Sequence, residues 1–251
     1  MRILLTNDDG IFAPGLAAVY KQLCSLGEVL VVAPTDSQSG ASHSVTFFEP
    51  LGCTKVEIEG LFTGFGVHGS PADCVKLAVM QLHEGPFDLV VAGINNGANV
   101  GINVYYSGTV AAAMEAAFLG IPSVALSLVC EPEMNFDAAA WHARGVIEKL
   151  APFQKGDVLN VNIPRLSRGD PKPMRVVPQA TEGFEEYYVP QTNINSETVF
   201  QLTGGRFRPE SAPADTSTLS EGHITVTPLR ADMTDYDRIS ALDSRLNLDR
   251  S

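Results

Sequence analysis

Short apolar runs alternate with helical patterns along the first two-thirds of the chain. Each run is brief, rich in Val, Leu and Ile, and ends at a turn signal, which is typical of strands buried on both faces of a parallel sheet. The expected strands are residues 3–5, 29–33, 88–93, 123–127 and 158–163. Helical spacing and cap residues predict helices at residues 15–25, 71–83, 109–119 and 136–150. This order predicts an α/β fold with a Rossmann-like, doubly wound and mostly parallel sheet.

Two regions depart from this alternation. Residues 54–58 and 61–67 are expected to form short strands joined as a hairpin. After residue 164 the chain becomes polar, and it carries further strand patterns with no clear helix between them, which predicts an antiparallel extension. The expected strands of this extension are residues 174–178, 198–202 and 224–228, and residues 211–220 are expected to form a loop.

The change at residue 164 divides the chain in two. We expect a Rossmann-like core over residues 1–164. Residues 165–251 are expected to supply a hairpin extension, a final sheet strand and a C-terminal oligomerisation arm. The tail from residue 232 is charged and weakly periodic, so it forms either a frayed end or an arm that packs on another subunit.

Composition excludes several classes of protein. Apolar residues make up 45% of the chain and charged residues 18%, which argues against global disorder. The net charge is −12 and no stripe is rich in Lys and Arg, so neither a nucleic-acid polymer nor an anionic membrane is expected as a partner. An acidic protein still binds phosphate where a metal and backbone N–H groups supply a positive field.

The four cysteines lack the spacing of a zinc site or a redox pair. Cys24 and Cys74 are expected on helix faces among apolar residues, where a free thiol behaves as a small hydrophobe. We therefore expect reduced thiols and a cytoplasmic location. The first strand begins at once, so no signal peptide is expected, and no apolar stretch is long enough to span a bilayer.

Two adjacent aspartates follow the first expected strand, in the run Thr6-Asn7-Asp8-Asp9-Gly10. Ligands of open α/β sheets bind just beyond the carboxyl ends of the strands. Paired carboxylates repel each other at such a position unless a cation lies between them. The pair therefore predicts a hard divalent metal, and the alternative is an exposed turn, since Asn, Asp and Gly all favour turns.

Other strand ends carry further oxygen ligands. The second expected strand leads into a polar loop at residues 35–44, and the run Gly93-Ile94-Asn95-Asn96-Gly97-Ala98-Asn99 follows another strand. Hydroxyl, carboxamide and carboxylate oxygens suit Mg²⁺, Mn²⁺ or Ca²⁺ rather than zinc.

The run Tyr106-Ser107-Gly108-Thr109 precedes an Ala-rich helix. A helix N-terminus binds anions, although Ser107 or Thr109 also suits a plain N-cap. A metal opposite an anion site predicts metal-assisted hydrolysis of a phosphoester. His43, in the second loop, is a weaker candidate for touching phosphate or acting as general acid.

These motifs together resemble the stationary-phase survival protein SurE family of metal-dependent 5′/3′-nucleotidases. They occur in the family's order from residue 1 to about residue 235. The matching stretches are residues 6–10, Ala33-Pro34 with residues 39–42, residues 69–75, residues 93–95 with 97–99, residues 106–110 and residues 226–229.

The resemblance implies one divalent metal per subunit, Mg²⁺ or Mn²⁺, held by a set of four residues. It also implies a phosphate site at the start of the Ala-rich helix, a catalytic role for the two aspartates, and homodimers or homotetramers that exchange C-terminal arms. The implied substrates are nucleoside 5′-monophosphates, with 3′-monophosphates and short polyphosphate as further substrates, hydrolysed by a metal-bound water. The implied metal ligands are Asp8, Asp9, Ser39 and Asn95, and the implied phosphate-site residues are Ser39, Gly40, Asn99, Ser107, Gly108 and Thr109.

The chain also departs from the family pattern. Gln38 stands where Arg is common, Ala92 stands where Ser is common, and residues 182–188 are acidic where the family is often basic. These departures bear on substrate preference. Two alternative functions remain open: an aspartyl-phosphate phosphatase with Asp8 as the nucleophile, and a non-catalytic nucleotide or metal sensor.

Overall fold

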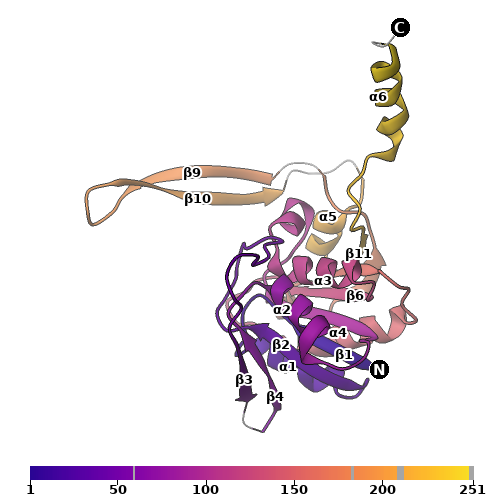
Figure 1. Cartoon of the computed structure of the whole chain (residues 1–251). Coiled ribbons are helices and arrows are strands. Elements are labelled where there is room, and N and C mark those ends of the chain that lie inside the picture. Colours follow the sequence, from indigo (N-terminus) through magenta and orange to yellow (C-terminus); the bar gives the residue numbers. More distant parts are fainter. Residues whose placement is uncertain (59, 182–183, 208–211, 249–251) are drawn as a thin grey trace.

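The computed structural model describes residues 1–58, 60–181, 184–207 and 212–248. In these residues a central sheet of nine strands is flanked by helices on both faces (Figure 1). In spatial order its strands are β3 (Cys53–Ile58), β4 (Phe62–Val67), β2 (Glu28–Pro34), β1 (Arg2–Thr6), β5 (Leu89–Asn96), β6 (Ser123–Leu128), β7 (Val158–Ile163), β11 (His223–Leu229) and β8 (Lys172–Val176).

The middle of the sheet is parallel. Strands β4, β2, β1, β5, β6 and β7 pair side by side in parallel, while β3 is antiparallel to β4 and β11 is antiparallel to β7. The Rossmann-like, mostly parallel sheet predicted from the sequence is confirmed, and so is the β3–β4 hairpin. Because β1 lies between β2 and β5, the loops after these three strands emerge at one edge of the sheet.

Alternate residues of each strand pack on opposite helical layers. Ile3 and Leu5 belong to the core beneath α1 (Pro14–Leu23) and α4 (Phe136–Leu150), which contact each other. Leu4 belongs to the core beneath α2 (Pro71–Leu77) and α3 (Gly108–Phe118). Burial on both faces explains why the strand patterns are apolar runs without alternation.

Two predicted helix starts have the expected cap hydrogen bonds. The hydroxyl of Ser70 accepts from the Asp73 N–H at 3.1 Å, and the Asp73 carboxylate accepts from the Ser70 N–H at 2.9 Å. The carboxamide oxygen of Asn135 accepts from the Ala138 N–H at 3.0 Å at the start of α4. Each side chain thus satisfies an N–H group that the helix leaves without a partner. Helix α2 ends earlier than predicted, and Ala78–Leu82 continues as a π-helix.

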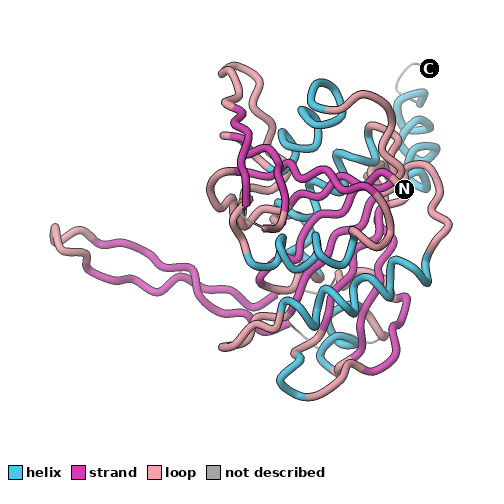
Figure 2. The backbone as a smooth tube through the Cα atoms, turned by 90° about the horizontal axis from the view of Figure 1, so that it is seen from below, coloured by secondary structure: helices cyan, strands magenta, loops and turns pink. Residues whose placement is uncertain are grey.

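The C-terminal third differs from the expectation in several elements. Strands β9 (Phe184–Thr192) and β10 (Thr198–Phe207) form a separate antiparallel ribbon that projects from the body (Figures 1 and 2). The sequence pattern missed β9, and it predicted only the first half of β10. The predicted hairpin extension is therefore present as a long ribbon. Strands β8 and β11 lie in the central sheet, so the expected grouping of all three strands in one antiparallel extension is wrong. A final sheet strand was also expected in this part of the chain, and β11 occupies such a position beside β7.

Two helices occupy segments in which no helix was predicted. Helix α5 (Asp215–Ser220) lies where a loop was predicted, and α6 (Tyr236–Leu248) lies in the tail, for which a frayed end and an arm were the two alternatives. Figure 1 shows α6 standing away from the central sheet. The division of the chain at residue 164 stays a prediction. Short 3₁₀-helices occupy Gly101–Tyr105 and Leu166–Arg168.

Cys74 is buried as expected, but Cys24 is exposed at the C-terminal cap of α1, so its placement on an apolar helix face was wrong. Within the described ranges, no helix has the length and apolar character needed to cross a bilayer.

Truncating a buried side chain of β1 tests the packing of the sheet against its helices. Leu4 is 0% exposed, so Leu4→Ala removes packing against α2 and α3 and should lower the free energy of unfolding by about 2–5 kcal/mol in urea titrations. Ile194, between the strands of the ribbon, is 100% exposed, and Ile194→Ala should change that free energy by less than about 0.5 kcal/mol. Equal losses for the two variants would contradict the described core.

Candidate functional site

The turn after β1 carries the two aspartates and is held by Asn7. The Asn7 side chain donates to the Gly10 carbonyl at 2.9 Å and accepts from the Gly10 N–H at 3.2 Å. Asn7 is fully buried and Asp8 is 4% exposed, so this is not the exposed turn considered from the sequence. The turn hydrogen bonds and a ligand role for the aspartates are compatible, because Asn7 fixes the backbone that directs the two carboxylates.

Asp8 contacts the first turn of α3. Its Oδ2 accepts from the Thr109 N–H at 3.1 Å, and its Oδ1 accepts from the Thr109 hydroxyl at 2.5 Å. A Cβ atom on Gly108 would lie 2.9 Å from the Asp8 Cβ and 3.1 Å from the Pro71 Cγ, so only glycine permits this approach. The end of β1 and the start of α3 therefore meet directly, with residues 8, 108 and 109 in one cluster.

Asp9 faces the end of β5 instead. Its Oδ2 accepts from the Asn96 N–H at 3.2 Å. The neighbouring Asn95 is half-buried, and its side-chain N–H donates to the Gly97 carbonyl at 2.8 Å. This contact holds the Asn95 carboxamide in place at the strand end, on the segment that contacts Asp9.

The loop after β2 joins the same edge. The Gln38 N–H donates to the Asp8 carbonyl at 2.7 Å, which ties this loop to the turn after β1. Ser39 and Gly40 follow and are exposed, and the Ser39 hydroxyl lies 3.1 Å from the Ser37 hydroxyl. The structure therefore brings residues 8, 9, 38–40 and 95–96 to one edge of the sheet.

Two of the expected phosphate-site side chains already have protein partners. Ser107 caps α3, where its hydroxyl accepts from the Val110 N–H at 3.1 Å, as the simpler interpretation of this motif held. The Asn99 carboxamide donates to the Ser127 hydroxyl at 2.9 Å. Ser107 and Asn99 are both buried, so neither presents a free side chain on an open surface.

Residues that the sequence analysis missed hold Asn99. The Asn162 carboxamide oxygen accepts from the Asn99 N–H at 2.8 Å, and the side chains of Asn160 and Asn162 donate to the Asn99 carbonyl at 2.7 and 3.1 Å. The signal was present in β7, where two Asn residues alternate with Val within a buried strand. Two side-chain amides buried in this pattern point to the same face of the strand and require hydrogen-bond partners there.

The electrostatics of the aspartate pair favour a cation. Burial raises the pKa of Asp8 above its ordinary value, the hydroxyl of Thr109 opposes this shift, and the negative charge of Asp9 raises the pKa further. Burial also raises the pKa of Asp9. A divalent cation between the two carboxylates would remove both penalties. In the described part of the chain no group of three His, Cys, Asp or Glu side chains is placed to bind a metal, so further ligands would have to be neutral oxygens.

Comparison with known proteins identifies the family. The family model described as "Survival protein SurE" matches residues 3–186. The chain belongs to the SurE family. A relative from Rhodopirellula baltica named "5'-nucleotidase SurE" is 44% identical over 246 residues, which cover 96% of this chain and 97% of that protein. A second relative of the same name, from Syntrophus aciditrophicus, is 41% identical over 100% of this chain and 96% of its own length.

A solved structure supports the same assignment. The SurE protein from Aquifex aeolicus superposes with a TM-score of 0.84 at 35% sequence identity, covering 97% of this chain and 99% of that chain. The recognition of the SurE family from the sequence motifs is therefore confirmed.

The departures from the family pattern occupy three different environments. Gln38 is half-buried, and its backbone holds Asp8. Ala92 is fully buried in the core beside α2 and α3, so its side chain acts through packing. Of the acidic segment, residues 184–188 lie in β9, and residues 182–183 lie outside the described residues.

The contact between Asp8 and α3 predicts how a substitution of Gly108 changes the stability of the protein. Gly108→Ala should lower the free energy of unfolding by about 1–3 kcal/mol, because the new methyl group overlaps Asp8 and Pro71. The matched control is Gly145→Ala inside α4, where nothing lies within 4 Å of the new Cβ. That variant should stabilise the chain by up to about 1 kcal/mol. Urea unfolding measures both, and stabilisation by both substitutions would show that Asp8 does not lie against Gly108.

Proposed function

We propose that this chain is a 5′-nucleotidase that hydrolyses the phosphate ester of nucleoside 5′-monophosphates. The observation that carries the proposal is the contact between Asp8 and the first turn of α3. It places a carboxylate pair, which attracts a cation, beside a helix N-terminus, which attracts a phosphoryl group. The relatives named 5′-nucleotidase match this chain over nearly its whole length, which supports the same activity.

Asp8, Asp9, Ser39 and Asn95 are the residues that would hold one divalent metal, Mg²⁺ or Mn²⁺. The donor set fits such an ion, because the carboxylates repel each other and the two remaining ligands are a hydroxyl and a carboxamide oxygen. When bound, the cation polarises the phosphoryl oxygens and lowers the pKa of a water molecule that it binds. Asp8 accepts one hydrogen bond at each oxygen and keeps further lone pairs for the ion.

The residues around Asp8 orient the reacting groups. Thr109 donates twice to Asp8, which favours the ionised carboxylate and fixes its orientation. Gly108 lets Asp8 lie against the start of α3, where we propose that the phosphoryl group binds beside Ser107, Ser39 and Gly40. Asn99 is held by Ser127 and β7, so we propose that it forms the wall of the phosphate pocket. Dipoles fixed in this way stabilise charge that develops in the transition state without reorganising.

Substituting either aspartate tests the proposal. Asp8→Asn and Asp9→Asn should each abolish Mn²⁺-dependent release of phosphate from AMP or GMP and weaken Mn²⁺ binding, because each removes a charged ligand. The matched control is Asp137→Asn, an exposed aspartate on α4, which should retain full activity. A phosphate assay and isothermal titration with Mn²⁺ measure both effects, with a chelator as a further control. A wild-type rate in Asp8→Asn would contradict the site.

Substrate range and chemical route need separate measurements. Nucleoside 3′-monophosphates and short polyphosphate are proposed as further substrates, and a phosphate-release screen ranks them against 5′-monophosphates. Rapid acid quenching with labelled AMP separates direct attack by water from attack by Asp8. A phosphorylated protein would favour the aspartyl-phosphate route, and binding without phosphate release would favour a sensor.

We further propose that the chain forms a homodimer or homotetramer through its C-terminal arm. Ile239, Leu242 and Leu246 recur at helical spacing on one side of α6, and all three are exposed. An apolar stripe on a helix that stands away from the body requires a partner surface (Figure 1).

A charge on this stripe tests the arm. Leu242→Asp should shift the protein toward smaller species in size-exclusion chromatography with light scattering, because it puts a carboxylate into the proposed interface. Ser244→Asp is the control, since helical geometry places residue 244 on the other side of α6. If Leu242→Asp leaves the mass unchanged, the arm does not carry the interface.

A further inference from the structure

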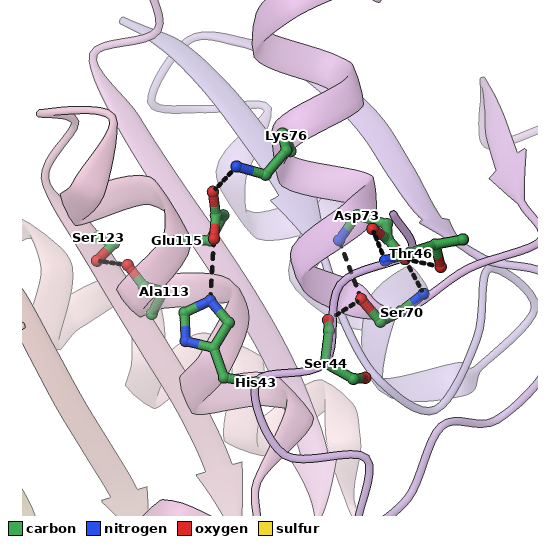
Figure 3. Close-up of polar contacts among 9 residues, drawn as sticks. All are labelled: His43, Ser44, Thr46, Ser70, Asp73, Lys76, Ala113, Glu115 and Ser123. Atoms are coloured by element: carbon green, nitrogen blue, oxygen red, sulfur yellow. Dashed lines mark hydrogen bonds and ion pairs between the residues drawn. The ribbon is translucent and has the colours of Figure 1, made fainter. Parts of the chain in front are cut away.

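A buried carboxylate in the middle of α3 has two side-chain partners, Lys76 and His43. Glu115 is 4% exposed on an otherwise apolar stretch of this helix. Its Oε1 lies 2.6 Å from the Lys76 Nζ on α2, and its Oε2 lies 2.9 Å from the His43 Nε2 (Figure 3). Each carboxylate oxygen thus has its own donor, as a buried charge requires. The hydrogen bond from His43 is the main cause that lowers the pKa of Glu115, and Lys76 adds to it, so the carboxylate remains ionised.

His43 belongs to the segment that carries two of the proposed ligands. Ser39 and Gly40 precede it in the loop between β2 and β3. Gln38 is tied to the Asp8 carbonyl, and the Ser42 N–H donates to the Tyr106 carbonyl at 3.1 Å. The His43 ring also stacks on Phe118, with ring centroids 5.6 Å apart. The segment therefore runs from Asp8, past the start of α3, to the middle of α3.

A second anchor follows directly after His43. The Ser70 hydroxyl donates to the Ser44 carbonyl at 2.6 Å. The N–H and the hydroxyl of Thr46 donate to Asp73 at 2.9 and 2.8 Å (Figure 3). Ser39 itself is exposed, so its position depends on the anchors on either side of it.

We propose that His43 is a positioning residue for the metal site. Held by Glu115, it fixes the segment that presents Ser39 and Gly40 to Asp8 and Asp9, and thereby sets the affinity for the divalent cation. This inference rests on the proposed function. His43 acts through the loop and not as the general acid considered from the sequence, because its Nε2 is bound to Glu115. Lys76 contacts the same carboxylate from α2 and stabilises the α2–α3 contact instead.

Three substitutions separate these roles. His43→Ala should weaken Mn²⁺ binding about tenfold, as is usual when a residue that orients a metal ligand is removed. It should also speed hydrogen–deuterium exchange at residues 37–42 and, at saturating Mn²⁺, leave kcat for AMP close to wild type. His43→Gln keeps an N–H for Glu115 and should restore Mn²⁺ affinity. Lys76→Met is the matched control, which should lower the melting temperature and leave Mn²⁺ affinity unchanged.

Several results would overturn the inference. Unchanged Mn²⁺ affinity and exchange in His43→Ala would remove the positioning role. Normal Mn²⁺ affinity with a lost kcat in both His43 variants would assign proton transfer to His43 instead. If Lys76→Met weakens Mn²⁺ binding as much as His43→Ala does, the effect of His43 is a general loss of stability.

If His43→Ala does not fold, His43→Phe keeps an aromatic ring against Phe118 and removes only the hydrogen bond to Glu115, and the same measurements apply to it. A wild-type chain that does not bind Mn²⁺ would contradict the proposed function, and exchange at residues 37–42 would then decide the positioning role alone.

Discussion

The contact between the Asp8 carboxylate and the first turn of α3 is the constraint on which the rest of this site depends. A carboxylate that is nearly excluded from water is stable only when donors or a cation surround it. Thr109 supplies two donors, and Gly108 leaves the space in which they reach Asp8. The same contact fixes where β1 ends relative to α3, so it couples the geometry of the sheet to the geometry of the candidate phosphate site.

The polar residues around this contact each hold a segment of the backbone in position. Asn7 fixes the turn that carries the aspartates, and Asn160 and Asn162 fix the peptide of Asn99 from the neighbouring strand. Glu115 fixes the loop after β2 through His43. Each of these side chains is buried or half-buried and directs its polar atoms toward a loop. Loops at the carboxyl edge of the sheet are thereby ordered by the rigid elements behind them, as a pre-organised site requires.

The sequence predicted most of the strands and helices of the core, but fewer of the elements after residue 164. The strands of the core were recognised because burial on both faces makes them continuous apolar runs. Strand β9 was missed because the ribbon is exposed, so no buried face imposes a pattern on it. Helix α5 was missed because Ser and Thr are weak helix formers, and its stability comes from packing on β11. Helix α6 exposes its apolar stripe, so its weak periodicity did not distinguish a frayed end from an arm.

By itself, the sequence determined that a parallel sheet forms and that Asp8, Asp9 and Ser39 follow strand ends, because the hydrophobic period and the turn residues are local properties. Asn95 was expected beyond its strand and lies within the last residues of β5 (Leu89–Asn96) instead. Only the tertiary structure decided which side chains meet. Thr109 reaches Asp8 from 101 residues away, and His43 reaches Glu115 from 72 residues away. Such contacts follow from the strand order, with β1 between β2 and β5, and from the burial of α3 against the sheet. A local sequence pattern indicates which face of a helix or strand is apolar. The partner of a buried charge depends on how separate helices and strands pack together, which the local pattern does not contain.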